Sequence, residues 1–469
     1  MKILGQYAKE AFLVVFFVLL FFLTSFFGLW LLIWLVGIPL LALVYNKPIK
    51  RSFFLSLAVS FIAVSISFTW VINYSLYVYL LSVIVFSSFL VLFALIFSLV
   101  SKKLKGFLKI FVAPFVFSVL MLVYSLSPIN SYWADWSMFN PLAAPLIWFI
   151  GSEGITFIII LFYSSVLFSI VEKNRIAFLA AVLIVVVMGA SYLYSHNAQP
   201  YGEKIKVALI QGNFPQTWEW RNENAKGIVF DSYKKLSLVA SIENPDIIIW
   251  PEYAIADDFL DDEDFFEKVA DISIQTDAYL VLGTVRFLDG FSDGRRNRNN
   301  IAVVFSPEGE MLGEYNSVSP LPFDKEVIKG DSISSFDTKI GNFGVSLCYE
   351  ETQNDIARKL SKYGSGFLIS MANEAVLDNS SGFNLISRYP DLRAAENGKY
   401  LLRVTNTGIT KIVNPYGKIE KSIEPYRQGI LIGEIYSNEK TRFYSAYGNL
   451  ILYIVLALLG LLFIGNLRK

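Results

Sequence analysis

Residues 11–45 read AFLVVFFVLLFFLTSFFGLWLLIWLVGIPLLALVY, an almost continuous apolar run interrupted near its middle by Gly28. About 20 apolar residues are needed to cross the hydrocarbon core of a bilayer, so a run of this length is enough for two spans. Gly28 marks the expected turn between them. The stretch therefore predicts that the N-terminal part of the chain is embedded in a membrane.

Further apolar stretches of similar length follow this run. They predict spans at about 52–73, 76–100, 106–126, 147–171 and 176–194, and one more at about 448–465. Charged residues make up only 17% of the chain, whereas soluble domains contain about a quarter. We therefore expect an α-helical membrane bundle of about eight spans, with seven transmembrane helices in residues 1–196, a polar domain in 197–440 and a C-terminal transmembrane helix in 441–469.

The loops between these spans differ in charge. With the N-terminus inside the cell, the inner segments contain every lysine and arginine of the loops, namely Lys47, Lys50, Arg51, Lys102, Lys103, Lys105, Lys109, Lys173, Arg175, Arg468 and Lys469. The alternate loops, near residues 73–74 and across 127–145, contain none. Lysine and arginine are retained on the cytoplasmic side of membrane proteins. The polar domain is therefore expected outside the cytoplasm.

The polar region has a different pattern. Short apolar runs such as KVALIQ, YLVLGTV and GFLISMAN alternate with polar or helical stretches, for example 224–243 and 259–275. Buried strands separated by helices are typical of an α/β domain. The net charge of the chain is zero, which gives no indication of a nucleic-acid partner.

Cys348 is the only cysteine of the chain, and His196 is the only histidine. An intramolecular disulfide is therefore impossible and a His/Cys metal site is nearly excluded, so we expect no metal. The strand-like GVSL runs straight into Cys348, and the polar, helix-like EETQNDIARKL follows. A thiol at such a turn lies near backbone N–H groups that stabilise a thiolate or an oxyanion. We interpret Cys348 as a nucleophile; the alternative is a buried structural cysteine.

Glu252 occupies a comparable position in PDIIIWPEYAI, residues 245–255. Four apolar residues end in Trp250-Pro251, and proline ends the pairing of a strand, so the next side chain emerges at the edge of the sheet. A carboxylate there can act as general base to a thiol if the fold brings the two together. The alternative is a loop glutamate in solvent.

The order of these motifs resembles the nitrilase (carbon–nitrogen hydrolase) superfamily, whose members fold as αββα sandwiches and use a Glu, Lys and Cys triad. With its flanking helices the whole chain is similar to the apolipoprotein N-acyltransferases in particular. The resemblance implies that Glu252 is the base and Cys348 the nucleophile, with Tyr349 and Glu350 beside it. It also matches Trp220, in VALIQGNFPQTWEW, to a substrate-site tryptophan.

The chain departs from this family at one catalytic position. Tyr315 and the pair Pro322-Phe323 fix the register of the family stretch, and the position of the triad lysine is Ser317. Serine has no positive charge to stabilise a tetrahedral intermediate. Lys325 is the nearest basic side chain, next to Glu326, which matches a further carboxylate of the family. We expect Lys325 to supply the missing charge if the protein is active.

The resemblance implies a two-step acyl transfer at a bacterial inner membrane, without a cofactor. Cys348 would take an acyl chain from a phospholipid, and the amine of a diacylglyceryl-cysteine lipoprotein would accept it. The enzyme is expected to act as a monomer, with its catalytic domain on the periplasmic side. Two alternatives stay open: a degenerate protein that binds lipid or lipoprotein without turnover, and an amidase or another acyltransferase on the same scaffold.

The charge pattern of the loops predicts that both termini face the cytoplasm and that residues 197–440 face outward. Cysteine-accessibility labelling of a probe placed at Lys103 checks this. The probe should be protected from a membrane-impermeant reagent in intact cells, and labelling from outside would refute the orientation.

Overall fold

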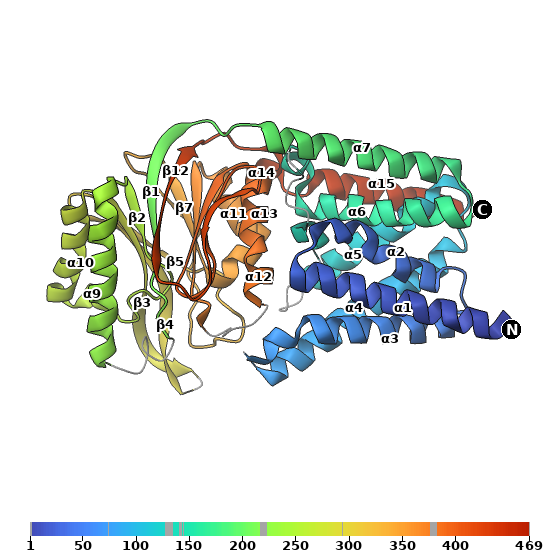
Figure 1. The fold of residues 1–469 in the computed structure, drawn as a ribbon, viewed down its shortest axis with the longest axis horizontal. Helices are drawn as coiled ribbons and strands as arrows, with labels where there is room; N and C mark the ends of the chain where they lie inside the picture. Colours follow the sequence, from blue (N-terminus) through green and yellow to red (C-terminus); the bar gives the residue numbers. More distant parts are fainter. Residues whose placement is uncertain are drawn as a thin grey trace. The chain divides into compact units, whose positions relative to one another are not determined.

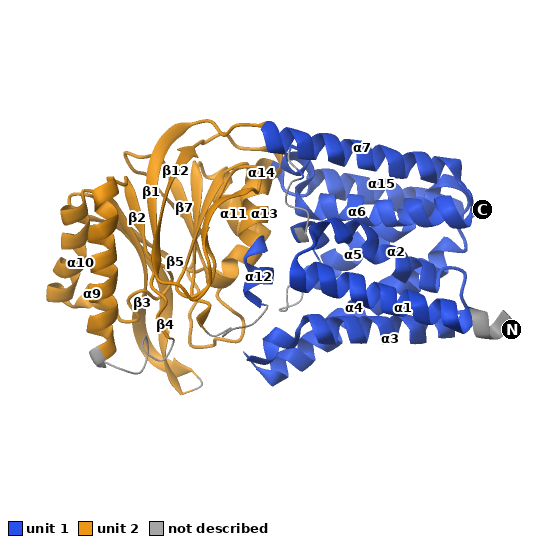
Figure 2. Cartoon of the chain, viewed as in Figure 1, with its two compact units in different colours: residues 1–197, 379–388, 447–469 blue, residues 198–378, 389–446 orange. Residues whose placement is uncertain are grey.

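The computed structural model describes residues 2–73, 75–126, 135–139, 143, 145–215, 223–292, 294–375 and 382–468. The chain forms two compact units (Figure 2). Unit 1 comprises residues 1–197, 379–388 and 447–469, and unit 2 comprises residues 198–378 and 389–446.

Unit 1 is helical. Its helices are α1 (Lys2–Phe27), α2 (Ile33–Val44), α3 (Ile49–Ser67), α4 (Leu76–Ser101), α5 (Val112–Ser125), α6 (Ile147–Val171), α7 (Arg175–Asn197), α12 (Gly382–Ile386) and α15 (Leu450–Leu467). Within the described residues, seven helices are long and apolar enough to cross a membrane. The predicted membrane bundle is therefore confirmed.

The second half of the opening apolar run forms a shorter helix than expected. Gly28 ends α1 in the left-handed region, at φ +70°. After a 3₁₀ turn (Trp30–Leu32), α2 has only 12 residues, about 18 Å at 1.5 Å per residue, against about 30 Å for the hydrocarbon core. Of the eight expected spans, the described part of the chain thus contains seven long helices and this short one.

Helix α2 nevertheless returns the chain to the end of unit 1 from which α1 starts. The buried carboxylate of Glu10, on α1, accepts hydrogen bonds from Lys47 at 2.6 Å and from Arg51 at 2.8 Å, both beyond the end of α2. The two helices therefore form a hairpin whose open end is closed by this ion-pair cluster.

Unit 2 contains two six-stranded sheets (Figure 1). The first has the order β12-β1-β2-β3-β4-β5 and is formed by β1 (Glu203–Gln211), β2 (Ile247–Ile249), β3 (Tyr279–Ser292), β4 (Arg295–Phe305), β5 (Met311–Asn316) and β12 (Gly429–Ser437). The second has the order β11-β10-β9-β8-β7-β6 and is formed by β6 (Ser335–Phe336), β7 (Phe343–Leu347), β8 (Phe367–Ala372), β9 (Tyr400–Thr405), β10 (Thr410–Val413) and β11 (Ile419–Ile423). Strands β1, β2 and β3 are parallel to one another, as are β7, β8 and β9.

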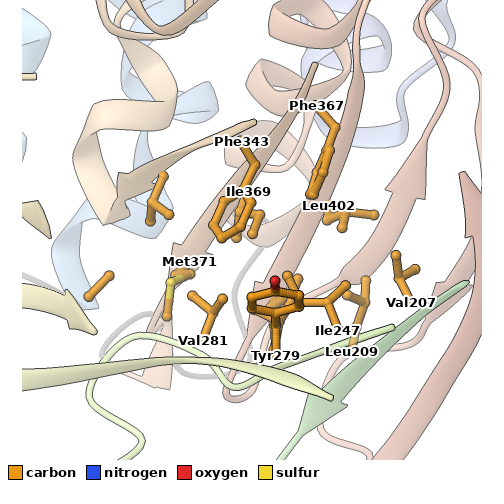
Figure 3. Close-up of a cluster of buried hydrophobic side chains, with 14 of the residues drawn as sticks. Val207, Leu209, Ile247, Tyr279, Val281, Phe343, Phe367, Ile369, Met371 and Leu402 are labelled. Atoms are coloured by element: carbon orange, nitrogen blue, oxygen red, sulfur yellow. The ribbon is translucent and has the colours of Figure 1, made fainter. Parts of the chain in front are cut away.

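The sheets pack face to face and helices cover their outer faces. Buried side chains of both sheets, among them Val207, Val281, Phe343 and Ile369, meet in one core (Figure 3). On the outer face of the first sheet lie α9 (Glu223–Ala240) and α10 (Glu263–Thr276). On the outer face of the second lie α11 (Asn354–Lys362) and α13 (Arg388–Asn397). These four layers confirm the predicted αββα sandwich. A short helix, α14 (Phe443–Tyr447), precedes α15.

The core between the sheets predicts a large effect of truncating Ile369, which is fully buried on β8. Ile369→Ala should cost about 2–5 kcal/mol and lower the melting temperature of the sandwich by roughly 4–20 °C, because a cavity remains. Thermal denaturation of the full-length protein in detergent measures this. The control is Ile419→Ala, at a side chain that is 45% exposed on β11. Equal shifts in both variants would contradict the assigned core.

Candidate active site

Glu252 and Cys348 meet where strands of opposite sheets end. Glu252 is the third residue after β2 of the first sheet, and Cys348 directly follows β7 of the second. The thiol of Cys348 donates a hydrogen bond to the Glu252 carboxylate. The structure therefore brings together the two side chains that the sequence predicts as base and nucleophile.

The Glu252 carboxylate is held from two more directions. It is buried, with 2% of the residue exposed. One oxygen accepts a hydrogen bond from the Asn300 side chain on β4 at 2.6 Å, and the other accepts from the backbone N–H of Asn373, after β8, at 2.7 Å. Both sheets thus fix the orientation of one carboxylate toward the thiol.

The backbone that carries Glu252 lies directly on Gly283 of β3. A Cβ atom added to Gly283 would lie 2.6 Å from the Cα of Glu252 and 2.7 Å from the carbonyl oxygen of Pro251. Only glycine permits this approach, because backbone atoms cannot move aside as a flexible side chain does. The indole of Trp250 is fully buried and donates to the Ser237 hydroxyl at 2.9 Å. These contacts anchor the loop on the first sheet.

Cys348 has a constrained backbone. Its φ is +51°, in the left-handed region that non-glycine residues seldom adopt. The residue is half-buried and begins a 3₁₀ turn, Cys348–Thr352, that leads to α11. The first N–H groups of such a turn have no carbonyl partner within it. They are candidate donors to an oxyanion formed on the thiol.

Burial sets the protonation of the pair. It raises the pKa of Glu252 to about 7, against hydrogen bonds from Asn300, Cys348 and Asn373 that lower it. Burial also raises the pKa of the Cys348 thiol well above its ordinary value, and the nearby Glu252 charge raises it further. The resting pair is thus a neutral thiol beside a carboxyl group that titrates near neutral pH, which suits a general base.

Glu350 fixes the neighbouring loop to the nucleophile turn. Its buried carboxylate accepts hydrogen bonds from the Tyr315 hydroxyl at 2.9 Å and the Ser317 hydroxyl at 3.0 Å. It also accepts from the backbone N–H groups of Val318, Ser319 and Leu347 at 2.8–3.1 Å. Ser317, which stands where the family has its lysine, is therefore part of this clamp.

Glu351 faces a second buried network. The Arg403 guanidinium on β9 donates to Glu351 and to Glu374, each with a contact of 2.8 Å, and Ser370 also donates to Glu351 at 2.8 Å. A Cβ on Gly408 would lie 1.6 Å from the Glu374 carboxylate. Two adjacent glutamates thus tie the turn after Cys348 to different parts of the sandwich.

The stretch 317–330 contains two further predicted side chains, Glu326 and Lys325. Glu326 is buried and paired with Arg295 at 2.7 Å and Arg298 at 3.5 Å. Lys325 is exposed. From the same stretch, the negative charge of Asp324 raises the pKa of both Glu252 and Cys348.

Of the two remaining predicted residues, Tyr349 and Trp220, the structure describes only Tyr349. Tyr349 is half-buried beside the nucleophile, and burial raises the pKa of its phenol to about 12. Trp220 lies outside the described residues. No group of three or more His, Cys, Asp or Glu side chains gathers as a metal site within the described ranges.

Sequence reasoning missed three residues that position the pair, namely Asn300, Gly283 and Arg403. Asn373 could have been found from the sequence, because it directly follows a run of residues that predicts a strand. Asn406 follows β9 in the same way, and its side chain exchanges hydrogen bonds of 2.8 and 2.9 Å with the backbone of Phe214. Polar residues after parallel strands were the usable signal, since such strand ends lie on one edge of a sheet.

Comparison with known proteins gives a consistent family match. A family model described as carbon–nitrogen hydrolase matches residues 206–442. The chain is 27% identical over 340 residues to a Geobacter metallireducens protein named apolipoprotein N-acyltransferase, covering 66% of this chain and 64% of that protein. It is 28% identical over 410 residues to a protein of the same name from Wigglesworthia glossinidia brevipalpis, covering 80% of each.

Two solved structures are similar to about half of the chain. An amidase of the nitrilase superfamily from Nesterenkonia is 16% identical, with a TM-score of 0.40, and covers 50% of this chain and 92% of that one. The NitFhit protein of C. elegans is 17% identical, with a TM-score of 0.41, and covers 55% and 65%.

The pKa of Glu252 predicts how the reactivity of Cys348 depends on pH. Only ionised Glu252 can accept the thiol proton, so the rate of Cys348 acylation by p-nitrophenyl butyrate should rise through a midpoint near pH 7 and level off above it. Glu252→Gln should slow acylation by about 100- to 10,000-fold. Stopped-flow release of nitrophenolate measures both. The control is Glu308→Gln, at an exposed side chain paired with Lys339. A midpoint near pH 4.5 would show that burial does not shift the base.

Proposed function

Because the chain belongs to the carbon–nitrogen hydrolase family, we propose that it uses Cys348 and Glu252 to transfer a fatty acyl chain from a phospholipid to the N-terminal amine of diacylglyceryl-cysteine lipoproteins. The observation that carries this proposal is the hydrogen bond between the Cys348 thiol and a buried carboxylate with a pKa near 7. The names of the relatives supply the acceptor class.

The first half-reaction forms a thioester. Glu252 takes the thiol proton as the sulfur of Cys348 bonds to the carbonyl carbon of the ester, whose π electrons move to oxygen. The tetrahedral intermediate then reforms its carbonyl and expels the lysophospholipid alkoxide, which takes the proton from Glu252. Covalent catalysis divides a difficult acyl transfer into two easier steps.

The second half-reaction passes the chain to the amine. The neutral α-amine of the lipoprotein adds to the thioester carbonyl and gives a proton to Glu252. Collapse of the intermediate forms the amide bond and breaks the carbon–sulfur bond, and the departing thiolate recovers the proton. Glu252 thus serves as base and acid in turn, which a pKa near 7 favours.

The proposed setting is the bacterial inner membrane. The seven long apolar helices of the described chain make this a multi-pass membrane protein. Loop charges support an orientation with unit 2 on the periplasmic side. Both proposed substrates are held in the membrane by their acyl chains, so a monomer whose catalytic domain is joined to a membrane bundle reaches them without leaving the membrane.

The structure offers arguments on both sides of the rival functions. Ser317, which stands at the family's lysine position and donates to Glu350, is what a protein without turnover would have, since serine carries no charge. The intact Glu252–Cys348 pair, held by Asn300 and Asn373, argues for a working site. An amidase on this scaffold would use the same first step, so the acceptor distinguishes it.

Cys348→Ser should abolish the acyl-enzyme and leave the fold unchanged, because a serine hydroxyl is far less acidic than a thiol. Intact-mass spectrometry of the full-length protein incubated with phospholipid should show an added acyl chain in the wild type alone. Complementation of a strain lacking its own N-acyltransferase tests the acceptor. Complementation by Cys348→Ser would rule out the assigned nucleophile.

A further inference from the structure

Arg298 lies on the face of β4 that carries the site. Side chains alternate between the two faces of a strand. Ala302 and Val304 point into the core between the sheets, whereas Ile301 and Val303 point toward α9 and α10. Asn300 continues the inward series and reaches Glu252 at 2.6 Å. Arg298 is the next inward-facing residue along the strand.

The guanidinium of Arg298 is enclosed, unlike the neighbouring cations. Its side chain is 13% exposed, against 69% for that of Arg295. The backbone of Arg298 pairs with Glu326 and Ile328, in the stretch 317–330, at 2.9 and 2.8 Å. Glu326 lies 3.5 Å from Arg298 but 2.7 Å from Arg295, so Arg295 is its closer partner.

The charge of Arg298 acts on the phenol of the residue next to the base. Burial raises the pKa of the Tyr253 phenol and the Glu252 charge raises it further, whereas Arg298 lowers it. Tyr253 directly follows Glu252, and its phenol also responds to Cys348. The pKa of the Tyr253 phenol thus responds to the arginine, the base and the nucleophile.

The reaction needs a positive charge at this point. Addition of the Cys348 sulfur to an ester carbonyl creates an oxyanion in a partly buried site where Asp324 already contributes negative charge. Backbone N–H groups stabilise such an oxyanion, and a fixed cation stabilises it further. Arginine stays protonated when buried and offers several donors in a planar array.

We propose that Arg298 is a catalytic residue that stabilises the oxyanion of the tetrahedral intermediates on Cys348. This inference rests on the proposed acyl transfer. Arg298 takes no proton and forms no covalent bond; its N–H groups donate to the oxygen that gains the π electrons and release it when the carbonyl reforms. It stands as an alternative to Lys325, the candidate that the sequence supplied.

The test compares acylation rates of the full-length protein in detergent. Two acyl donors are used, p-nitrophenyl butyrate and dioleoyl phosphatidylethanolamine, and intact mass reports the thioester. Arg298→Ala and Arg298→Gln should lower the maximal acylation rate about 100- to 1,000-fold with little change in KM. Arg298→Lys should retain much of the rate, because it keeps the charge. Added methylguanidinium should restore part of the rate of Arg298→Ala.

Arg296→Ala is the matched control. Arg296 lies two residues away on the same strand, is exposed, and stacks on Phe287. Its loss should leave acylation unchanged. Lys325→Ala is the rival variant. The proposal is overturned if Arg298→Ala acylates at the wild-type rate, or if Lys325→Ala alone is slow. It also fails if Arg298→Lys is as slow as Arg298→Ala and methylguanidinium restores nothing, since that pattern indicates a structural role.

The two donors separate this inference from the function on which it rests. Acylation of the wild type by the nitrophenyl ester but not by the phospholipid would remove the proposed donor and leave the role of Arg298 measurable. Acylation by both donors, at equal rates in Arg298→Ala and wild type, would remove Arg298 and leave the function. A wild type that neither donor acylates would overturn both.

Discussion

The Glu252 carboxylate is the constraint around which unit 2 is arranged. Removing a carboxylate from water is costly unless hydrogen bonds replace the lost hydration. Here the replacements come from β4, from the turn after β8 and from the thiol at the end of β7. They do not compensate fully, so the pKa settles near 7. That incomplete compensation makes the group a usable base, because a fully stabilised carboxylate would have a low pKa and would be too weak a base to take the thiol proton.

The same arrangement explains why the turn after Cys348 contains two buried glutamates. Glu350 orders the stretch after β5, and Glu351 joins Arg403 and Glu374 beneath the second sheet. A left-handed residue such as Cys348 persists only where its surroundings hold it in place. The acidic pair provides those surroundings; the guanidinium of Arg403 pairs with Glu351, whose charge still raises the pKa of the Cys348 thiol.

Much of this was accessible from the sequence, and the limits have physical reasons. Strand-like runs ending in Glu252 and Cys348 gave the fold and the pair, because strand ends carry side chains to one edge of a sheet. Asn300 and Arg298 lie within β4, which runs antiparallel to β3, and the approach of Asn300 to Glu252 depends on how β2, β3 and β4 pair within the first sheet. Gly283 matters through a backbone contact that leaves no local pattern. Lys325 was inferred from its place on the stretch that follows Ser317, and its role stays a prediction. The length of α2 was overestimated because apolar composition does not distinguish burial among helices from burial in lipid.

The cluster that closes the hairpin of α1 and α2 links biogenesis to packing. In the proposed orientation, Lys47 and Arg51 are still unpaired as the nascent chain leaves the translocon, so their full charge keeps the loop in the cytosol. Once the hairpin forms, both cations pair with the one buried carboxylate of Glu10 and help to hold unit 1 together. Loss of Glu10 would leave the insertion signal intact and loosen the assembled hairpin, whereas loss of the two cations would impair both stages. One pair of side chains therefore acts at two successive stages, first in orienting the chain and then in packing it.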